Sequence, residues 1–157
     1  MTASLGVIRG SNTAHPSSFR VEVLHKEAST SRHTSLFPSS QSGAPCAGVH
    51  LILDLFGATR LDDTKLVEAT LRRCVDAAVA TLLHIHLHPF EPNGGISGVA
   101  VLAESHISIH SWPEAEYAAL DIFMCGQARP ERCIEILLEV FKPQRAVMEQ
   151  ILRGRAA

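Results

Sequence analysis

The chain has 157 residues, of which 46% are hydrophobic and 19% charged, and its formal net charge is -2. This length and composition predict one globular domain, and the lack of a basic stripe argues against a nucleic-acid partner. The sequence contains no run of about 20 apolar residues, and its N-terminus lacks an apolar segment followed by a small-residue cleavage site. We therefore expect a cytoplasmic protein without a membrane partner.

The first third of the chain differs in composition from the rest. Residues 1–47 are rich in Ser and Thr and contain only short apolar runs, which predicts a disordered N-terminal extension. At Val49 the composition changes abruptly to an apolar run of strand length that Gly57 closes. The folded domain is therefore expected over 48–157.

Periodicity and turn residues define the elements of this domain. Alternating or short apolar runs predict strands, helical spacing predicts helices, and Pro and Gly separate them. The expected order is a strand at 49–56, a helix at 64–80, strands at 82–90, 98–103, 106–112 and 117–124, a helix between Pro130 and Pro143, and a strand at 146–152. This order predicts an α+β fold, a two-layer α/β sandwich in which a largely antiparallel sheet carries its helices on one face.

Histidines alternate with leucine and isoleucine in the strand expected at 82–90. Strict alternation places the histidines on one face and the apolar residues on the other. The two sets are His84, His86 and His88, and Leu83, Ile85 and Leu87.

The four cysteines do not form a recognisable metal or disulfide pattern. Their spacing is irregular and no CxxC pair occurs, which argues against a zinc knuckle or a disulfide framework. Cys74 and Cys133 fall in helical apolar patterns and are expected to be buried. Cys125 instead ends a strand and precedes Gly126, a position where functional residues are common.

Three stretches of the chain carry a family resemblance. They are 95–98 (GISG), 103–114 (AESHISIHSWPE) and 118–126 (AALDIFMCG). With these stretches the sequence resembles prokaryotic S-adenosylmethionine decarboxylase proenzymes from about Gly48 to Gly154, so that only the extension lies outside the resemblance. The roles in the next three paragraphs are those that the resemblance implies.

Ser105 matches the serine that becomes a covalently bound pyruvoyl cofactor in the family. Loss of carbon dioxide from an amino acid leaves a carbanion, and a ketone converted to a Schiff base with the substrate is the required electron sink. The Ser105 hydroxyl attacks the carbonyl of Glu104, and the resulting ester eliminates the Glu104 carboxylate. The resemblance therefore implies self-cleavage between Glu104 and Ser105 into a 1–104 chain and a 105–157 chain.

Three further residues match the family's proton-transfer positions. His110 matches the histidine that moves protons during self-cleavage, for which an imidazole is suited near neutral pH. Ser97 matches a hydroxyl that assists at the same carbonyl. Cys125 matches the acid that protonates the substrate α-carbon after decarboxylation. Alternation places Ser105 and His110 on opposite strand faces, so their meeting requires a bend at the cleavage bond.

Substrate contacts are implied for Glu114 and Phe90. Glu114 matches a residue that hydrogen-bonds the ribose, and Phe90 lies in a loop that resembles an aromatic platform for the adenine ring and the sulfonium. The loop departs from some relatives by one extra residue at Gly94-Gly95 and by Leu87 and Asn93 in place of aromatic residues.

We thus expect decarboxylation of S-adenosylmethionine for spermidine biosynthesis, by an enzyme without a metal. Since one sheet face needs a cover, a homo-oligomer of cleaved protomers, a dimer or larger, is expected. A pyruvoyl-dependent arginine or ornithine decarboxylase is an alternative, because substrate choice rests on loops. A metal site combining the three strand histidines with His106 or His110 and a non-catalytic partner subunit are further alternatives, although the latter usually lacks the serine or the cysteine.

Overall fold

The computed structural model describes residues 20–25 and 46–154, which form seven strands, two α-helices and a 3-10 turn. The elements in chain order are β1 (Arg20–His25), β2 (Gly48–Phe56), α1 (Thr64–Ala77), β3 (Leu82–Pro89), β4 (Ile96–Leu102), β5 (Ser105–Trp112), η1 (Pro113–Ala115), β6 (Tyr117–Cys125), α2 (Glu131–Phe141) and β7 (Arg145–Arg153). All strands and helices expected from 49 onward are present, and none of the described helices is long and apolar enough to cross a membrane.

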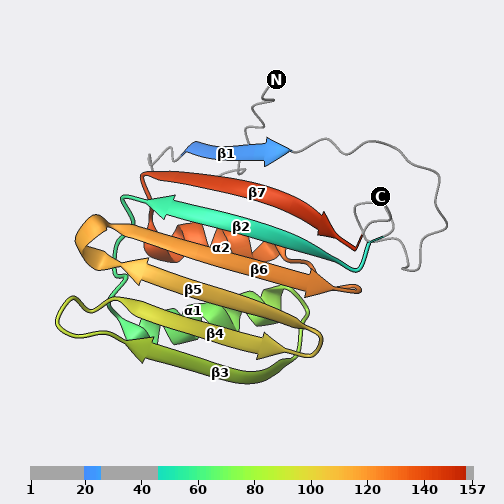
Figure 1. Ribbon diagram of the computed structural model, residues 1–157, viewed down its shortest axis with the longest axis horizontal. Coiled ribbons are helices and arrows are strands. Elements are labelled where there is room, and N and C mark those ends of the chain that lie inside the picture. The colour runs from blue at the N-terminus through green and yellow to red at the C-terminus, as the bar shows by residue number, and fades with distance from the viewer. Residues whose placement is uncertain (1–19, 26–45, 155–157) are drawn as a thin grey trace.

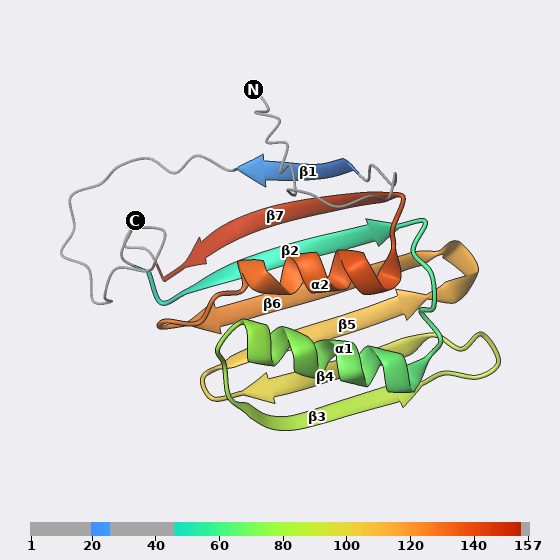
Figure 2. The same cartoon turned by 180° about the vertical axis from the view of Figure 1, so that it is seen from behind.

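The strands form one sheet in the order β1-β7-β2-β6-β5-β4-β3. All neighbouring strands are antiparallel except β1 and β7, which are parallel. Both helices pack on one face of this sheet, as the views from its two sides show (Figures 1 and 2). The expected two-layer α+β sandwich is confirmed.

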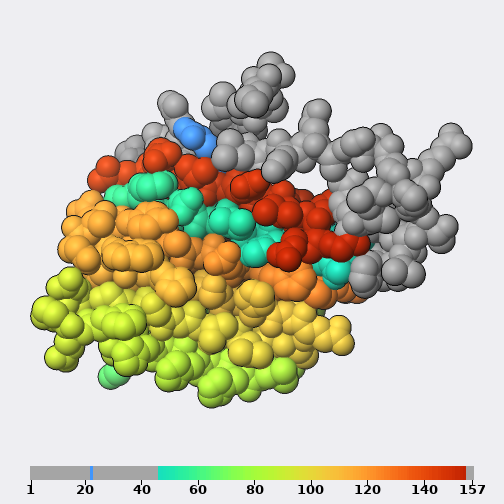
Figure 3. Space-filling view, viewed as in Figure 1, coloured from blue at the N-terminus to red at the C-terminus, as the bar shows by residue number. Residues whose placement is uncertain are grey.

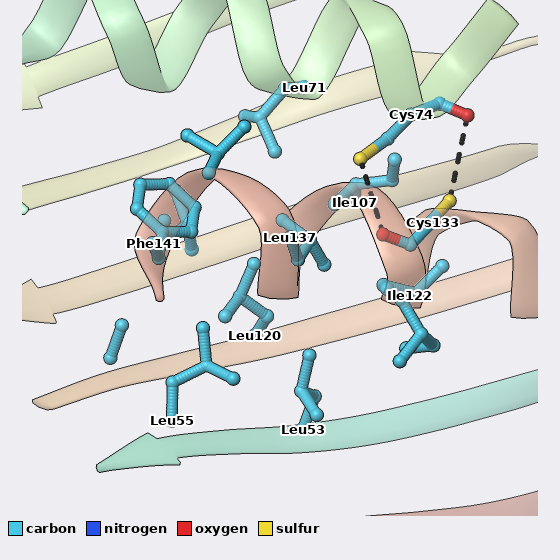
Figure 4. Packing of buried hydrophobic residues seen from close by; sticks show 14 of the residues in the cluster. Leu53, Leu55, Leu71, Cys74, Ile107, Leu120, Ile122, Cys133, Leu137 and Phe141 are labelled. Atoms are coloured by element: carbon cyan, nitrogen blue, oxygen red, sulfur yellow. Dashed lines mark hydrogen bonds between the residues drawn. The ribbon is translucent and has the colours of Figure 1, made fainter. Parts of the chain in front are cut away.

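The core lies between the sheet and the helices. Alternate residues of each central strand point into the core. Half-buried and buried residues therefore alternate along β6. Leu53 and Leu120 from the sheet and Phe141 from α2 are fully buried there (Figure 4). In the same layer, the thiol of Cys74 lies 3.8 Å from the backbone oxygen of Cys133, and the thiol of Cys133 lies 3.5 Å from the backbone oxygen of Cys74.

The first helix is shorter than its apolar pattern suggests. Asp63 caps its start by accepting a hydrogen bond from the backbone N–H of Leu66 at 2.9 Å. It ends at Ala77 rather than at residue 80, because Val79 has φ 58 and the N–H of Ala80 bonds to the carbonyl of Val75. A left-handed residue in this position closes a helix with a Schellman motif, which glycine normally provides.

A bulge in β3 overturns one expectation. The register of β3 against β4 shifts between Leu82 and His84, so strict alternation fails at Leu83. Leu83 is 64% exposed, and Leu82 packs against the core in its place together with Ile85 and Leu87. The three histidines do share the exposed side of the strand, as expected.

The stretch expected to be a disordered extension contributes an edge strand. β1 lies beside β7, and its Glu22 carboxylate is 3.9 Å from the Arg145 guanidinium. This strand differs from the expectation for residues 20–25, and the rest of the stretch up to residue 45 lies outside the described residues. The sheet face opposite the helices is covered by no other described element (Figure 3).

Candidate active site

Ser105 is the first residue of β5 and follows a two-residue turn. Leu102 of β4 pairs with Ser105, so Ala103 and Glu104 alone connect the two strands. Glu104 is exposed and has φ 71, in the left-handed region that residues other than Gly, Asn and Asp rarely occupy. The expected cleavage bond, between Glu104 and Ser105, therefore follows directly on a strained residue in a tight hairpin.

Cys125 lies next to Ser105 on the neighbouring strand. It is the last residue of β6, and its backbone N–H donates a hydrogen bond of 3.1 Å to the Oγ of Ser105. Burial raises the pKa of the Cys125 thiol above its usual value, and the negative charge of Glu104 raises it further. A side-chain hydrogen bond between the thiol and Ser105 lowers this pKa, and Cys46 raises it. The net direction keeps the thiol protonated, as a proton donor requires.

Ser97 and His110 form a second pair. They face each other across β4 and β5, and the Oγ of Ser97 lies 2.8 Å from the Nδ1 of His110. Both belong to the sheet face that the helices do not cover. The hydroxyl and the imidazole are thus already in hydrogen-bond contact, which is the arrangement that proton transfer between them needs.

The two pairs lie at opposite ends of the sheet. β5 runs without interruption from Ser105 to Trp112, and at about 3.3 Å per residue His110 lies about 16 Å along the strand from Ser105. In Figure 1 the β4–β5 hairpin is at the right, whereas the β3–β4 loop and the β5–β6 turn are at the left. The bend expected to bring Ser105 and His110 together within one chain is absent.

The two expected substrate contacts lie at the His110 end. Phe90 follows β3 and is half exposed, with its ring 4.8 Å from that of His88. Its loop is closed by the N–H of Phe90 donating to the carbonyl of Gly95 at 2.7 Å, and a Cβ on Gly95 would lie 2.8 Å from the Ser111 carbonyl oxygen. Glu114 is exposed in η1, beyond the end of β5.

The alternative of a metal centre has no site in the part of the chain that the structure describes. No three His, Cys, Asp or Glu side chains within residues 20–25 and 46–154 are arranged to hold a metal ion. His84, His86 and His88 lie opposite Val101, Val99 and Ser97 on β4, where no carboxylate joins them.

Sequence reasoning missed a polar network on the same open face. The two carboxylate oxygens of Asp121 lie 3.2 Å from His50 Nε2 and from the hydroxyl of Ser108. Arg153 Nη1 lies 3.2 Å from His50 Nδ1, and the arginine can only donate, so Nε2 carries the proton and donates to Asp121. The available signal was polar residues at alternate positions of otherwise apolar strands.

A second missed feature is a row of rings across the end of the open face. Tyr117 stacks on Trp112 with centroids 5.3 Å apart and lies 5.2 Å from Phe56, and the Arg145 guanidinium is 4.1 Å above the Phe56 ring. The Tyr117 hydroxyl donates to Asp54 at 2.5 Å. Burial together with this carboxylate raises the pKa of Tyr117 to about 12.

Comparison with known proteins decides the family. The model of the S-adenosylmethionine decarboxylase family matches residues 49–154, which include every residue of both pairs. The chain belongs to this family. The family region begins at β2, so the edge strand β1 lies outside it.

Individual members of the family agree over nearly their whole length. The S-adenosylmethionine decarboxylase proenzyme of Thermomicrobium roseum is 46% identical over 108 residues, which are 68% of this chain and 93% of that protein. The proenzyme of Methanococcus maripaludis is 46% identical over 110 residues, or 68% of this chain and 89% of that protein. The crystal structure of the adenosylmethionine decarboxylase from Aquifex aeolicus superposes with a TM-score of 0.63 at 30% identity and covers 73% of this chain and 96% of that one.

Proposed function

We propose that this chain is a self-cleaving proenzyme that decarboxylates S-adenosylmethionine to the aminopropyl donor used in spermidine biosynthesis. One observation carries the proposal: in a member of this family, Ser105 stands directly after a strained hairpin and shares a hydrogen bond with Cys125. A nucleophile, the carbonyl it must attack and a proton donor thus occupy one end of the sheet. Relatives that are named S-adenosylmethionine decarboxylase proenzymes support the choice of this substrate over arginine or ornithine.

Apart from one water molecule, maturation uses atoms of the chain alone. The Oγ of Ser105 bonds to the carbonyl carbon of Glu104, the peptide C–N bond breaks, and the proton passes to the nitrogen of residue 105. A base then removes the Cα hydrogen of residue 105, and the Glu104 carboxylate leaves from the β-carbon. The remaining enamine tautomerises to an imine, which takes up water and releases ammonia, so that residue 105 becomes a pyruvoyl group. This group supplies the electron sink for decarboxylation.

Cys125 fits the residue that delivers a proton after the carboxylate is lost. Its strand neighbour is Ser105, and its raised pKa keeps the sulfur protonated near neutral pH. Delivery to the substrate carbon completes the turnover. Delivery to the carbon derived from Ser105 would instead convert residue 105 to alanine and inactivate the enzyme irreversibly.

The complete site requires two copies of the chain. Ser97 and His110 lie about 16 Å along the strand from Ser105 and face the uncovered side of the sheet. Two such sheet faces can stack about a two-fold axis that runs across the strands. That axis lays the His110 end of one copy over the Ser105 end of the other. We propose a dimer in which Ser97, His110, Phe90 and Glu114 of each copy serve the Ser105 and Cys125 of its partner.

Self-cleavage is tested on a denaturing gel and by mass spectrometry. Purified protein should separate into a chain ending at Glu104 and a chain of residues 105–157 whose N-terminus resists sequencing. Ser105→Ala should remain one chain without activity. Wild-type protein that persists as a single chain would refute the proposal.

The substrate is tested separately on cleaved protein. Release of carbon dioxide is compared between S-adenosylmethionine, arginine and ornithine at equal concentration. Activity with S-adenosylmethionine alone supports the proposal. Activity confined to arginine or ornithine would favour the alternative pyruvoyl-dependent decarboxylase and would leave the self-cleavage result intact.

A further inference from the structure

The hairpin at the cleavage bond is built from residues that its geometry disfavours. Two-residue hairpins favour type I′ or II′ turns, with sequences such as Asn-Gly, because these match the twist of the strands. Here the two residues are Ala103 and Glu104, and only Glu104 has a positive φ, the pattern of a type II turn in which Gly is preferred at the second position. The left-handed conformation disfavours an ordinary residue by a factor of roughly 5 to 30.

The sheet, rather than the Glu104 side chain, maintains this conformation. Within the described part of the chain, the exposed carboxylate of Glu104 has no hydrogen bond or ion pair that would favour a left-handed backbone. The constraint comes from both sides of the turn, where Leu102 pairs with Ser105 and the Cys125 N–H holds the Ser105 hydroxyl. The fold therefore imposes an unfavourable backbone on the residue whose carbonyl is to be attacked.

Other described residues share the positive φ but not the position. Val79 and Lys142 follow the ends of the two α-helices, Glu116 follows η1, and Arg60 lies in the connection after β2. None of these adjoins a bond that the proposed function breaks. Lys142 is exposed and lies beside the Phe56–Arg145 end of the sheet, opposite the cleavage hairpin, so it offers a matched control for removal of the same strain elsewhere.

We infer that the left-handed backbone of Glu104 stores strain that accelerates cleavage of the Glu104–Ser105 bond, an inference that rests on the proposed self-cleavage. When the acyl group moves from the nitrogen to the Oγ of Ser105, the path between the Glu104 carbonyl and the Cα of residue 105 gains one atom. The longer connection removes the constraint on the turn, and φ of Glu104 relaxes toward negative values. Elimination of the Glu104 carboxylate subsequently opens the hairpin altogether, so the relief is permanent.

A series of substitutions at Glu104 tests this inference. Glu104→Ala, Glu104→Asn and Glu104→Gly all lack the carboxylate, and their left-handed conformations become progressively less costly. Release of the 105–157 chain is followed by pulse-labelled cell-free synthesis and denaturing gels. Glu104→Ala should cleave fastest, Glu104→Gly slower by about 3-fold to 30-fold, and Glu104→Asn between them. Equal rates, or a faster Gly variant, would overturn the inference.

Two controls separate strain from flexibility and from failure of the proposed function. If Gly acted only by loosening the hairpin, Asn would cleave as fast as Ala, which overturns the inference. In a Ser105→Ala background that blocks cleavage, Glu104→Gly must resist urea better than Glu104→Ala, and the opposite order would also overturn it. Lys142→Gly should cleave at the wild-type rate. Absence of cleavage in wild type and in all variants would instead contradict the proposed self-cleavage.

Discussion

The backbone N–H of Cys125 donates a hydrogen bond to the Oγ of Ser105, and this contact joins the expected proton donor to the expected cofactor precursor. It arises because β5 begins where β6 ends, in an antiparallel pair whose register runs from His106 opposite Phe123 to Trp112 opposite Tyr117. Ser105 and Cys125 are 20 residues apart in the sequence, and the register places them at adjacent strand ends in the fold. The backbone of Cys125 is held beside residue 105 by the sheet itself.

Mixed dimers should recover self-cleavage that neither parent variant performs. Ser105→Ala lacks the nucleophile but keeps His110, whereas His110→Ala keeps the nucleophile and lacks the imidazole. If His110 acts on the partner's Ser105, co-expression of the two variants should release a 105–157 chain carrying the His110→Ala mass, whereas each variant alone should stay intact or cleave very slowly. Mass spectrometry of the mixture measures this. Intact chains in a mixture shown to contain mixed dimers would exclude action across the two copies.

Removing the Cys125 thiol should impair turnover more than maturation. Cys125→Ala takes away the proton donor, and loss of general acid catalysis reduces carbon dioxide release by about 10²-fold to 10⁴-fold. Cleavage at Glu104–Ser105 should continue, and the 105–157 chain should accumulate an N-terminal alanine. Cys125→Ser is the matched variant, because its hydroxyl is of similar size but a much weaker acid. Equal activity of Cys125→Ala and wild type would assign proton donation elsewhere.

Turnover should persist to higher pH than an ordinary thiol allows. The donor acts in its protonated form, and burial together with Glu104 raises the pKa of Cys125, so activity is lost only as pH rises through this raised value. Glu104→Gln removes the second largest of the causes that raise this pKa. The alkaline limb of carbon dioxide release by cleaved wild type measures the raised value. In the uncleaved Ser105→Ala background, where the hairpin is intact, the Cys125 thiol should react with iodoacetamide at lower pH when Glu104→Gln is added. A thiol reactivity that stays in place or moves to higher pH would contradict a charge effect of Glu104 on Cys125.

Ser111 should matter for stability although it lies beside His110 in sequence. Its buried hydroxyl accepts from the Ile96 N–H and donates to the Leu61 carbonyl, both at 2.9 Å, and so ties the start of β4 to the connection after β2. Ser111→Ala leaves both groups without a partner and should lower the free energy of unfolding by about 1–3 kcal/mol. Urea denaturation in the uncleaved Ser105→Ala background measures this.

Ser108→Ala provides the comparison for that experiment. Ser108 is half-buried, and its hydroxyl donates to the partly exposed carboxylate of Asp121 at 3.2 Å. In a single protomer water can replace this hydrogen bond, so the loss of stability, measured at concentrations at which the uncleaved chain is monomeric, should stay below about 1 kcal/mol. A larger effect for Ser108 than for Ser111 would show that the Ile96 and Leu61 contacts do not stabilise the fold.

The amino-acid sequence by itself determined the elements of the domain from β2 onward and supplied the candidates for its reactive side chains. Alternating apolar residues in β2 and β6 and the helical apolar spacing in α2 report burial on one side, which a local pattern encodes directly. At two of the places where local rules failed, a single residue was responsible. Leu83 lies in a bulge, and Val79 ends α1 in a left-handed conformation. Neither position is occupied by the glycine or asparagine that usually marks it.

Only the tertiary structure decided which of the reactive residues meet. The family motif places Ser97, Ser105, His110 and Cys125 in one set. In the fold, however, a hydrogen bond joins Ser105 to Cys125 at one end of the sheet, and strand register pairs Ser97 with His110 at the other. The separation follows from the fixed rise of an extended strand, which holds residues of one strand apart however close they are in sequence. Register depends on two strands together, and the strained turn at Glu104 is a consequence of register. Neither can therefore be predicted from a short segment of the sequence.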